Sequence, residues 1–240
     1  MLKIVTPMVG QDLYQKTAYN LFPKILNEVR GKTIFEYSQK YLETLDEEFT
    51  NIFIRPTFAN VQYQIDNIIQ RIVGENANFI NVADITAGAL CTCLLAAEYW
   101  HDDDELIIYS ADQYLGVDCQ EIINSFRKKN VEVGLISFPS IHPKWSYIKR
   151  DSTGSIVEVV EKRAVSNEAL VSFYYFKQAS LFFRLATSAI VKSRSVNNIF
   201  YLSSCVNEAI LQRTNVFSFK IEGDKYFNFY DFDAVKRFNQ

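Results

Sequence analysis

Residues near the amino terminus have the types and the order that phosphate binding requires. An apolar run at 2–6 is followed by Gly10, and Lys24 comes soon afterwards in a Pro-Lys pair. A glycine after a strand lets backbone N–H groups approach an anion, and a lysine neutralises phosphate charge. An isolated lysine is more often a solvated surface residue. The order nevertheless indicates a nucleotide-binding loop with Gly10, the adjacent Gln11 and Lys24 as candidates.

Two further segments place polar or flexible residues directly after apolar runs. Asp112 follows the run at 105–109, and Thr86 and Gly88 follow the run at 78–82. A carboxylate at the carboxyl end of a strand can bind Mg²⁺, although a turn or a helix cap is the commoner role. Gly88 would allow close approach of a nucleotide base, or it could simply begin a helix.

A third group of residues has the chemistry of an acceptor site. Glu161 and Lys162 end an apolar run, so that a carboxylate and an ammonium group lie side by side. Such a pair can bind the hydroxyls and the phosphate of a phosphorylated acceptor, but an ordinary exposed strand face has the same pattern. Trp145 and Tyr147 lie on one face of a neighbouring strand by alternation. Trp145 could equally be a core residue.

Alternating elements must position these residues. Periodicity predicts strands near 2–6, 51–55, 78–82, 105–109 and 131–138, and helices at 33–45, 59–73, 87–100 and 119–130. Later strands are expected at 145–150, 156–162 and 171–176, with a hairpin turn at 151–154, and helices at 181–191 and 203–213. This order predicts an α/β fold with a mixed, mainly parallel sheet, helices on both faces and a small β-rich insertion in the C-terminal half. We expect one domain over 1–240.

Composition limits the kinds of partner. The chain has 240 residues, a formal net charge of −3 and a pI near 5.5, which argue against nucleic acid as the main partner. No apolar run is long enough to span a membrane. The four cysteines lack Cys-x-x-Cys spacing, so we expect reduced, mostly buried thiols and a cytoplasmic protein.

Several motifs in a fixed order carry a family resemblance. They are Thr6-Pro-Met-Val-Gly10, Pro23-Lys-Ile-Leu-Asn-Glu-Val-Arg-Gly-Lys32, Gly88-Ala-Leu-Cys-Thr-Cys-Leu-Leu-Ala96, Ser110-Ala-Asp-Gln113, His142-Pro-Lys-Trp-Ser-Tyr147, Glu158-Val-Val-Glu-Lys162, Tyr174-Tyr-Phe-Lys177 and Val196-Asn-Asn-Ile-Phe-Tyr201. Together they resemble the sugar-nucleotidyltransferase family of the GT-A fold, in the branch found in bacterial capsule and lipopolysaccharide loci. The resemblance covers nearly the whole chain.

The resemblance implies a reaction and a role for each residue. A phosphate oxygen of the acceptor attacks the α-phosphorus of a nucleoside triphosphate, and pyrophosphate leaves. Gly10 would bind the phosphates, Lys24 the α-phosphate side and Gly88 the base. Asp112 would bind Mg²⁺, and Glu161 with Lys162 would contact the acceptor, a sugar phosphate or a related compound for surface polysaccharide.

The chain departs from the family pattern at two places. The second glycine and the arginine of the family's loop fall on Asp12 and Tyr14, so a repulsive charge is added and an attractive one is lost. The second metal carboxylate is missing near the C-terminus, where Asn228 is the nearest polar residue, and Asp231 or Asp233 could substitute. Asn228 and Asp12 are therefore the candidate second ligands.

Three functions remain open on these residues. The first is an active nucleotidyltransferase, and the second is a nucleotide- or sugar-binding regulatory protein of the same fold with impaired catalysis. The third is a GT-A glycosyltransferase, for which Asp102-Asp-Asp104 has the required letters. We interpret that segment as a solvated acidic turn. The sequence does not specify the base, the acceptor or the oligomeric state.

Overall fold

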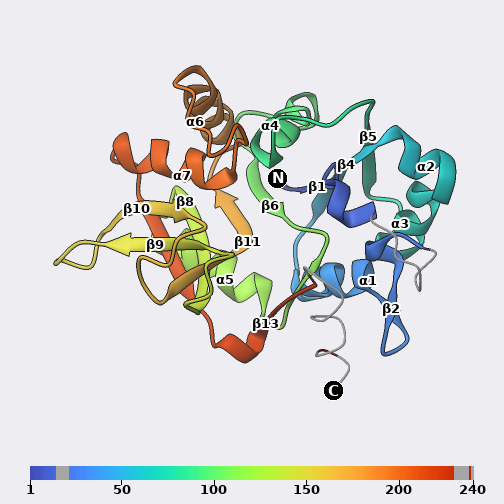
Figure 1. The fold of residues 1–240 in the computed structure, drawn as a ribbon, viewed down its shortest axis with the longest axis horizontal. Helices are drawn as coiled ribbons and strands as arrows, with labels where there is room; N and C mark the ends of the chain where they lie inside the picture. Colours follow the sequence, from blue (N-terminus) through green and yellow to red (C-terminus); the bar gives the residue numbers. More distant parts are fainter. Residues whose placement is uncertain (15–21, 230–237, 239–240) are drawn as a thin grey trace.

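The computed structural model describes residues 1–14, 22–229 and 238, and its centre is a nine-stranded mixed sheet (Figure 1). Its N-terminal half is parallel, in the order β6-β1-β4-β5. These strands are β1 (Leu2–Pro7), β4 (Phe49–Pro56), β5 (Ala77–Val82) and β6 (Glu105–Tyr109). Their apolar residues come from the runs that the sequence marked as strands. The predicted α/β fold with a mixed sheet is confirmed.

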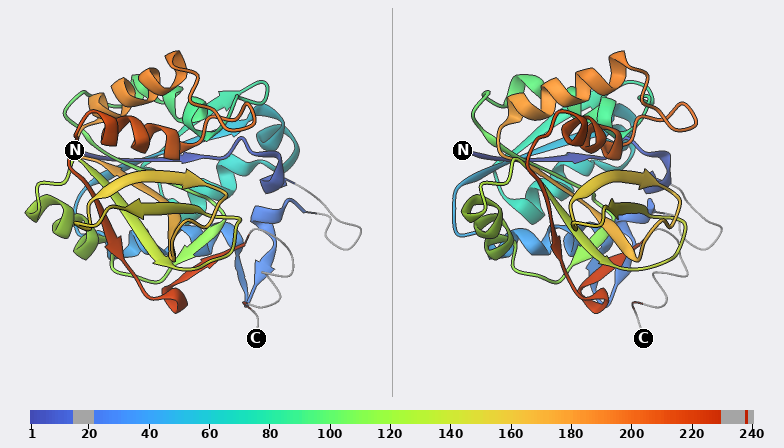
Figure 2. Two further views of the ribbon diagram at one scale, coloured as in Figure 1. Left: turned by 60° about the vertical axis from the view of Figure 1, so that its left-hand side comes forward. Right: turned by 90° about the vertical axis from the view of Figure 1, so that its left-hand side faces the viewer.

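Alternation along the central strands creates a core on each face of the sheet. In β6, Leu106 and Ile108 pack on one side, and Ile107 and Tyr109 pack on the other. The first side is covered by α4 (Ala89–Leu94), α6 (Ala179–Val191) and α7 (Leu202–Leu211), and the second by α5 (Cys119–Lys128), as the two views of Figure 2 show. Helices therefore cover both faces, as predicted.

The C-terminal half of the sheet is built on one antiparallel strand. That strand, β11 (Glu168–Phe176), pairs with β6, with β8 (Val133–Pro139) and with β9 (Ser146–Arg150). β10 (Ile156–Glu161) pairs with β9 as a hairpin, and β12 (Val216–Lys220) runs parallel to β8. The predicted turn forms at Asp151, whose carboxylate accepts hydrogen bonds from the backbone N–H groups of Thr153 and Ser155.

Three predicted helices are shorter or broken in the structure. The segment 33–45 is α1 (Ile34–Gln39) followed by a 3₁₀ turn, and 59–73 is two helices, α2 (Thr57–Tyr63) and α3 (Ile65–Val73). The break is at Gln64, which has a left-handed φ of 49° and ends α2. α4 stops at Leu94, before the predicted end at residue 100. No helix in the described part of the chain is long and apolar enough to cross a membrane.

Two small sheets were not predicted, because strands of two or three residues have no periodic signal. β7 (Gln113–Leu115) pairs with β13 (Tyr226–Asn228), and β2 (Glu28–Val29) pairs with β3 (Lys32–Thr33). The first pair matters for the site, since it begins directly after Asp112. The backbone N–H of Phe229 donates to the carbonyl oxygen of Asp112 at 2.8 Å, which brings the end of β13 beside this residue.

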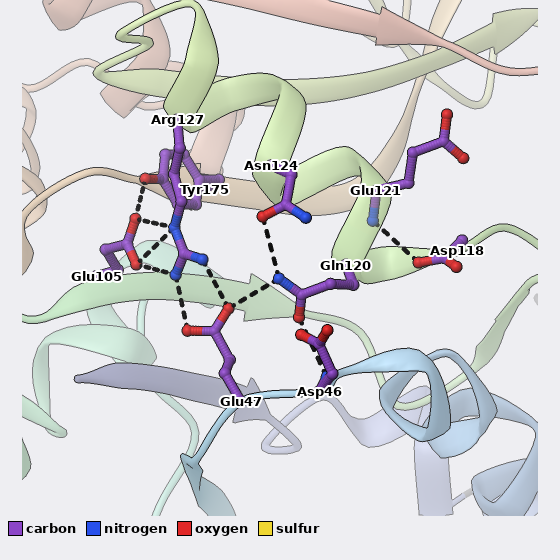
Figure 3. Close-up of polar contacts among 9 residues, drawn as sticks. All are labelled: Asp46, Glu47, Glu105, Asp118, Gln120, Glu121, Asn124, Arg127 and Tyr175. Atoms are coloured by element: carbon purple, nitrogen blue, oxygen red, sulfur yellow. Dashed lines mark hydrogen bonds and ion pairs between the residues drawn. The ribbon is translucent and has the colours of Figure 1, made fainter.

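A polar network holds the opposite edge of the sheet, where the parallel strands begin (Figure 3). The guanidinium of Arg127 on α5 donates to both carboxylate oxygens of Glu47, at 2.7 and 2.8 Å, and also to Glu105 at the start of β6. The hydroxyl of Tyr175 on β11 donates to Glu105 as well. The network thus joins three strands or their leading loops to one helix.

Candidate functional site

A cleft of about 390 Å³ opens beyond the carboxyl ends of the parallel strands. Its walls come from the loop after β1, the segment between β5 and α4, the segment after β6 and a loop before α7. The lining residues are Pro7, Val9, Gly10, Asp12, Leu13, Ile85, Thr86, Gly88, Ala89, Thr92, Ser110, Asp112 and Ile199. Four of the residues singled out in the sequence, Gly10, Thr86, Gly88 and Asp112, are therefore together in one cleft.

Strand register explains why residues so far apart in sequence meet here. β1 and β6 are parallel neighbours, with Val5 opposite Ile108, so the loops that follow them leave the sheet side by side. Gly10 and Asp112 lie on those two loops. Open α/β sheets bind ligands at this edge, because the loops after adjacent strands diverge and leave a crevice.

Lys24 is joined to the cleft through Asp112. Its Nζ lies 2.8 Å from Oδ2 of Asp112, while the Ser110 hydroxyl donates to Oδ1 of the same carboxylate at 2.7 Å. Lys24 is only 3% exposed, so it is not a solvated surface residue, which is the commoner role of an isolated lysine. Burial makes an unpaired charge costly, and each member of this ion pair therefore holds the other in place.

Gly88 makes a close backbone contact with another segment of its own chain. It has φ +129°, and a Cβ there would lie 2.5 Å from the carbonyl oxygen of Phe200 and 3.0 Å from a methyl carbon of Ile199. Phe200 accepts a hydrogen bond from the backbone N–H of Leu90 and donates its own to Ala87. The close approach that this glycine permits is thus made by residues 199–200, on the side where its side chain would be.

Comparison with known families assigns the chain. The sequence profile described as nucleotidyl transferase matches residues 18–219, well over half of the chain. This chain belongs to the nucleotidyl transferase family. The matched range starts after the loop that carries Gly10, Asp12 and Tyr14. No curated protein matches the sequence significantly.

Solved structures share the fold of this family member. A nucleoside-diphosphate-sugar pyrophosphorylase from Vibrio cholerae RC9 superposes with a TM-score of 0.83 at 16% identity, covering 100% of this chain and 99% of the other. A protein from Bacillus anthracis named as a glucose-1-phosphate thymidylyltransferase, solved in complex with sucrose, gives a TM-score of 0.76 at 14% identity, with 100% and 94% covered. At these identities the likeness establishes the fold.

The predicted acceptor residues lie outside the set that lines the cleft. The Glu161 carboxylate accepts hydrogen bonds from the hydroxyls of Ser146 and Ser203, at 2.6 and 2.9 Å. The Nζ of Lys162 lies 5.2 Å from the centre of the Tyr201 ring, within the range of a cation–π contact. Both residues are partly or fully accessible and come at the end of β10.

Tyr147 and Trp145 both pack against the same core cluster, Tyr147 buried within it and Trp145 half-buried at its side. Tyr147 is fully buried, and its hydroxyl donates to the carbonyl oxygen of His142 at 2.6 Å, so it cannot contact an acceptor in this structure. Tyr147, which the sequence placed in the acceptor group, therefore does not present its side chain to a ligand. Trp145 packs edge-on against Phe138 and Tyr226 in the same cluster, as its core interpretation requires.

The altered loop residues separate into two environments. Asp12 lines the cleft, whereas Tyr14 is 7% exposed and packs against the ring of Phe58, with Arg55 among its charged neighbours. Burial raises the pKa of Tyr14. Gln11 is exposed and is not among the cleft-lining residues. The side chain at position 14 is thus directed into a hydrophobic cluster instead of toward the cleft.

Asn228 and Asp12 are the two residues that could join Asp112 as oxygen ligands of a divalent cation. Asn228 pairs with Gln113 across β7 and β13, and its Oδ1 is buried with no hydrogen-bond partner among the described residues. Asp12 lies in the same cleft as Asp112. The described residues contain no cluster of three His, Cys, Asp or Glu side chains that could hold a metal alone. Phosphate oxygens would therefore have to complete the coordination. Asp231 and Asp233 lie outside the described residues.

The Asp102-Asp-Asp104 segment lies at the wrong edge of the sheet for the cleft. It precedes β6, whereas Asp112 follows it. Asp104 is 5% exposed and accepts a hydrogen bond from the backbone N–H of His101, so this part of the segment is not the solvated turn that we expected. The segment has a structural role at the start of β6, and it gives no support to a glycosyltransferase.

Ser110, Ile85 and Ile199 are among the cleft-lining residues that sequence reasoning missed. Ser110 is two positions before Asp112 and could have been found as a second hydroxyl partner in the same motif. Ile85 and Ile199 gave no signal, because an isoleucine in a loop has no type or spacing that marks a ligand contact. Ile199 reaches the cleft only through the pairing of its loop with Gly88.

Proposed function

We propose that this chain transfers a nucleotidyl group from a nucleoside triphosphate to a sugar phosphate or a related phosphorylated acceptor, releasing pyrophosphate. The product would be an activated sugar for surface polysaccharide, made in the cytoplasm. The observation that carries the proposal is the buried Lys24–Asp112 pair beside the glycine loop of the cleft. The names of the two similar structures, a sugar-nucleotide pyrophosphorylase and a thymidylyltransferase, support the class of substrate.

The chemistry asks the protein mainly to position and neutralise charge. An acceptor phosphate oxygen forms a bond to the α-phosphorus while the bond from that phosphorus to the bridging oxygen breaks, so the electron pair leaves with pyrophosphate. The Lys24 ammonium would offset the negative charge that builds up around the α-phosphate. Asp112 holds Lys24 in place, and Ser110 in turn holds the Asp112 carboxylate, so little reorganisation is needed during the reaction. Mg²⁺, with Asp112 as one ligand and Asn228 or Asp12 as the second, would supply further neutralisation of the triphosphate.

The acceptor would bind at the end of β10. Glu161 presents a carboxylate already oriented by two serine hydroxyls, and Lys162 adds a cation beside it. A carboxylate accepts hydrogen bonds from sugar hydroxyls, and an ammonium group binds a phosphate. The two residues would therefore recognise the two ends of a sugar phosphate.

A binding protein with impaired catalysis is the second candidate. The observation in its favour is that the arginine position of the family's loop is Tyr14, whose side chain is buried, while Asp12 adds a negative charge to the cleft. Such a protein would still bind a nucleotide but would not break the α–β phosphate bond.

An isotope exchange assay separates the two candidates. The protein is incubated with Mg²⁺, each nucleoside triphosphate, a panel of sugar phosphates and labelled pyrophosphate, and label in the triphosphate is measured. Exchange that is lost in Asp112→Asn supports the enzyme, with the matched variant Asp118→Asn, on the N-cap of α5, as control. Nucleotide binding by calorimetry without any exchange would leave only the binding protein.

A further inference from the structure

We propose that Ile199 is the residue that contacts the base of the bound nucleotide and contributes to base selection. This inference rests on the proposed function, because it assumes that the cleft binds a nucleoside triphosphate. Ile199 comes from a loop to which the sequence assigned no role in nucleotide binding. It lines the same cleft as the charged residues, but its side chain is apolar.

The lining of the cleft divides by chemistry into a charged part and an apolar part. Asp112, with its partner Lys24, and Asp12 provide the charges. The apolar part comes from Ile85, in the segment before Gly88, and from Ile199, in the loop before α7. These two large side chains are 59% and 41% exposed. Exposed apolar side chains gathered at a cleft mark a ligand contact. In the proposed function the phosphates bind at this charged part together with Mg²⁺, so the base is the portion of the ligand that is left for the apolar part.

The loop that carries Ile199 is rigid by construction. Val196 and Ile199 exchange two backbone hydrogen bonds of 3.0 Å, and the two residues between them, Asn197 and Asn198, have φ values of 52° and 61°. Positive φ at both central positions is the requirement of a type I′ turn, which asparagine tolerates. Phe200 then fastens the turn to the segment around Gly88 through its two backbone hydrogen bonds.

This fastening transfers the base contact from Gly88 to Ile199. The side of Gly88 where a Cβ would project is covered by the Phe200 backbone and by the Ile199 side chain, so a base cannot stack there. Ile199 itself keeps an exposed surface in the same cleft. An isoleucine has few rotamers, so its apolar surface can contact a flat ring without losing much side-chain entropy.

The test compares a ligand that has a base with one that does not. Calorimetry measures the binding of the best nucleoside triphosphate and of inorganic tripolyphosphate, both with Mg²⁺, to wild type, Ile199→Ala and Ile199→Thr. We expect Ile199→Ala to weaken nucleotide binding about five- to tenfold, from the loss of roughly one buried methylene equivalent or more, and to leave tripolyphosphate binding unchanged. Ile199→Thr keeps the β-branch but replaces a methyl-bearing carbon chain by a hydroxyl, and it should also weaken nucleotide binding. The ratio of the dissociation constants of Ile199→Ala and wild type is then measured with the triphosphates of the other bases.

A matched isoleucine serves as the control. Ile141 is 77% exposed in a different loop and does not line the cleft, so Ile141→Ala should bind both ligands as wild type does. Melting temperatures verify that each variant folds. If Ile199→Ala weakens both ligands equally or neither of them, the proposal is overturned while the proposed function stands. If wild type binds neither ligand, the proposed function fails and this inference fails with it.

Discussion

The two edges of the parallel sheet differ in how their charged groups are paired and in what they leave exposed. At the amino edge, Arg127 donates to both Glu47 and Glu105, so its charge is fully matched by carboxylates. At the carboxyl edge, Lys24 pairs with Asp112, and apolar side chains such as Ile199 stay exposed. One edge satisfies its polar groups internally, and the other leaves surface for a ligand. The same strands therefore carry a stabilising end and a binding end, which substitutions should separate.

The largest effect is expected at the carboxyl edge. Lys24→Met removes the ammonium group but keeps most of the buried stem, and we expect pyrophosphate exchange to fall about 10³-fold, since a single charge-stabilising group is worth 10²- to 10³-fold or more. Lys32→Met changes an exposed lysine in β3 and should leave exchange unchanged. Equal loss in both variants, at unchanged melting temperatures, would contradict a specific role of Lys24.

Position 14 tests whether the altered loop can be repaired. Tyr14→Arg would place a charge in a hydrophobic cluster close to Arg55, so we expect it to lower the free energy of unfolding by about 3 kcal/mol. It should not tighten triphosphate binding. Tyr14→Phe removes a hydroxyl that has no hydrogen-bond partner among the described residues, and it should stay within about 1 kcal/mol of wild type. Urea denaturation measures both, and a stable, tighter-binding arginine variant would show that the loop rearranges.

The amino edge should affect stability and not turnover. Arg127→Met leaves Glu47 and Glu105 without their shared cation, and we expect a loss of about 2 kcal/mol of unfolding free energy with pyrophosphate exchange unchanged. Lys128→Met alters the next residue of α5, which is exposed, and provides the control. A fall in exchange per folded molecule would show that the two edges are coupled.

The smallest effect concerns acid. The hydrogen bond from Arg127 lowers the pKa of Glu47 below its ordinary value of 4.5. The stabilisation is therefore present above that value and is lost as the pH falls through the lower pKa of the folded state. Because Glu47 is still partly exposed to solvent, we expect a difference of less than about 1 kcal/mol between wild type and Glu47→Gln, present at pH 7 and reduced at pH 3. In an Arg127→Met background the difference should be smaller at pH 7, because only the hydrogen bond from Gln120 to Glu47 remains.

The sequence predicted the strands well because their signal is local. Each central strand is five to nine residues long and rich in apolar residues, because it is buried on both faces. The break at Gln64 was invisible, since glutamine is a good helix former and its left-handed φ depends on how α2 and α3 pack. β7 and β13 were missed for a similar reason, because residues more than a hundred positions apart create them.

The site was predictable only where strand ends determine position. Gly10, Thr86, Gly88 and Asp112 follow parallel strands, so sheet topology alone puts them at one edge. Lys24 does not follow a strand directly, and it was predicted only from its position in the chain after Gly10. Trp145 and Tyr147 share a face as alternation requires, but nothing in the pattern tells whether that face is core or cleft.

β6 gives the site a long lifetime. This strand is bonded to β1 on one side and to β11 on the other, so its amide hydrogens should exchange with solvent only when the whole molecule opens. Ser110 and Asp112 come directly after it. Their position should therefore persist from one global unfolding event to the next, a period that hydrogen exchange at residues 105–109 would time.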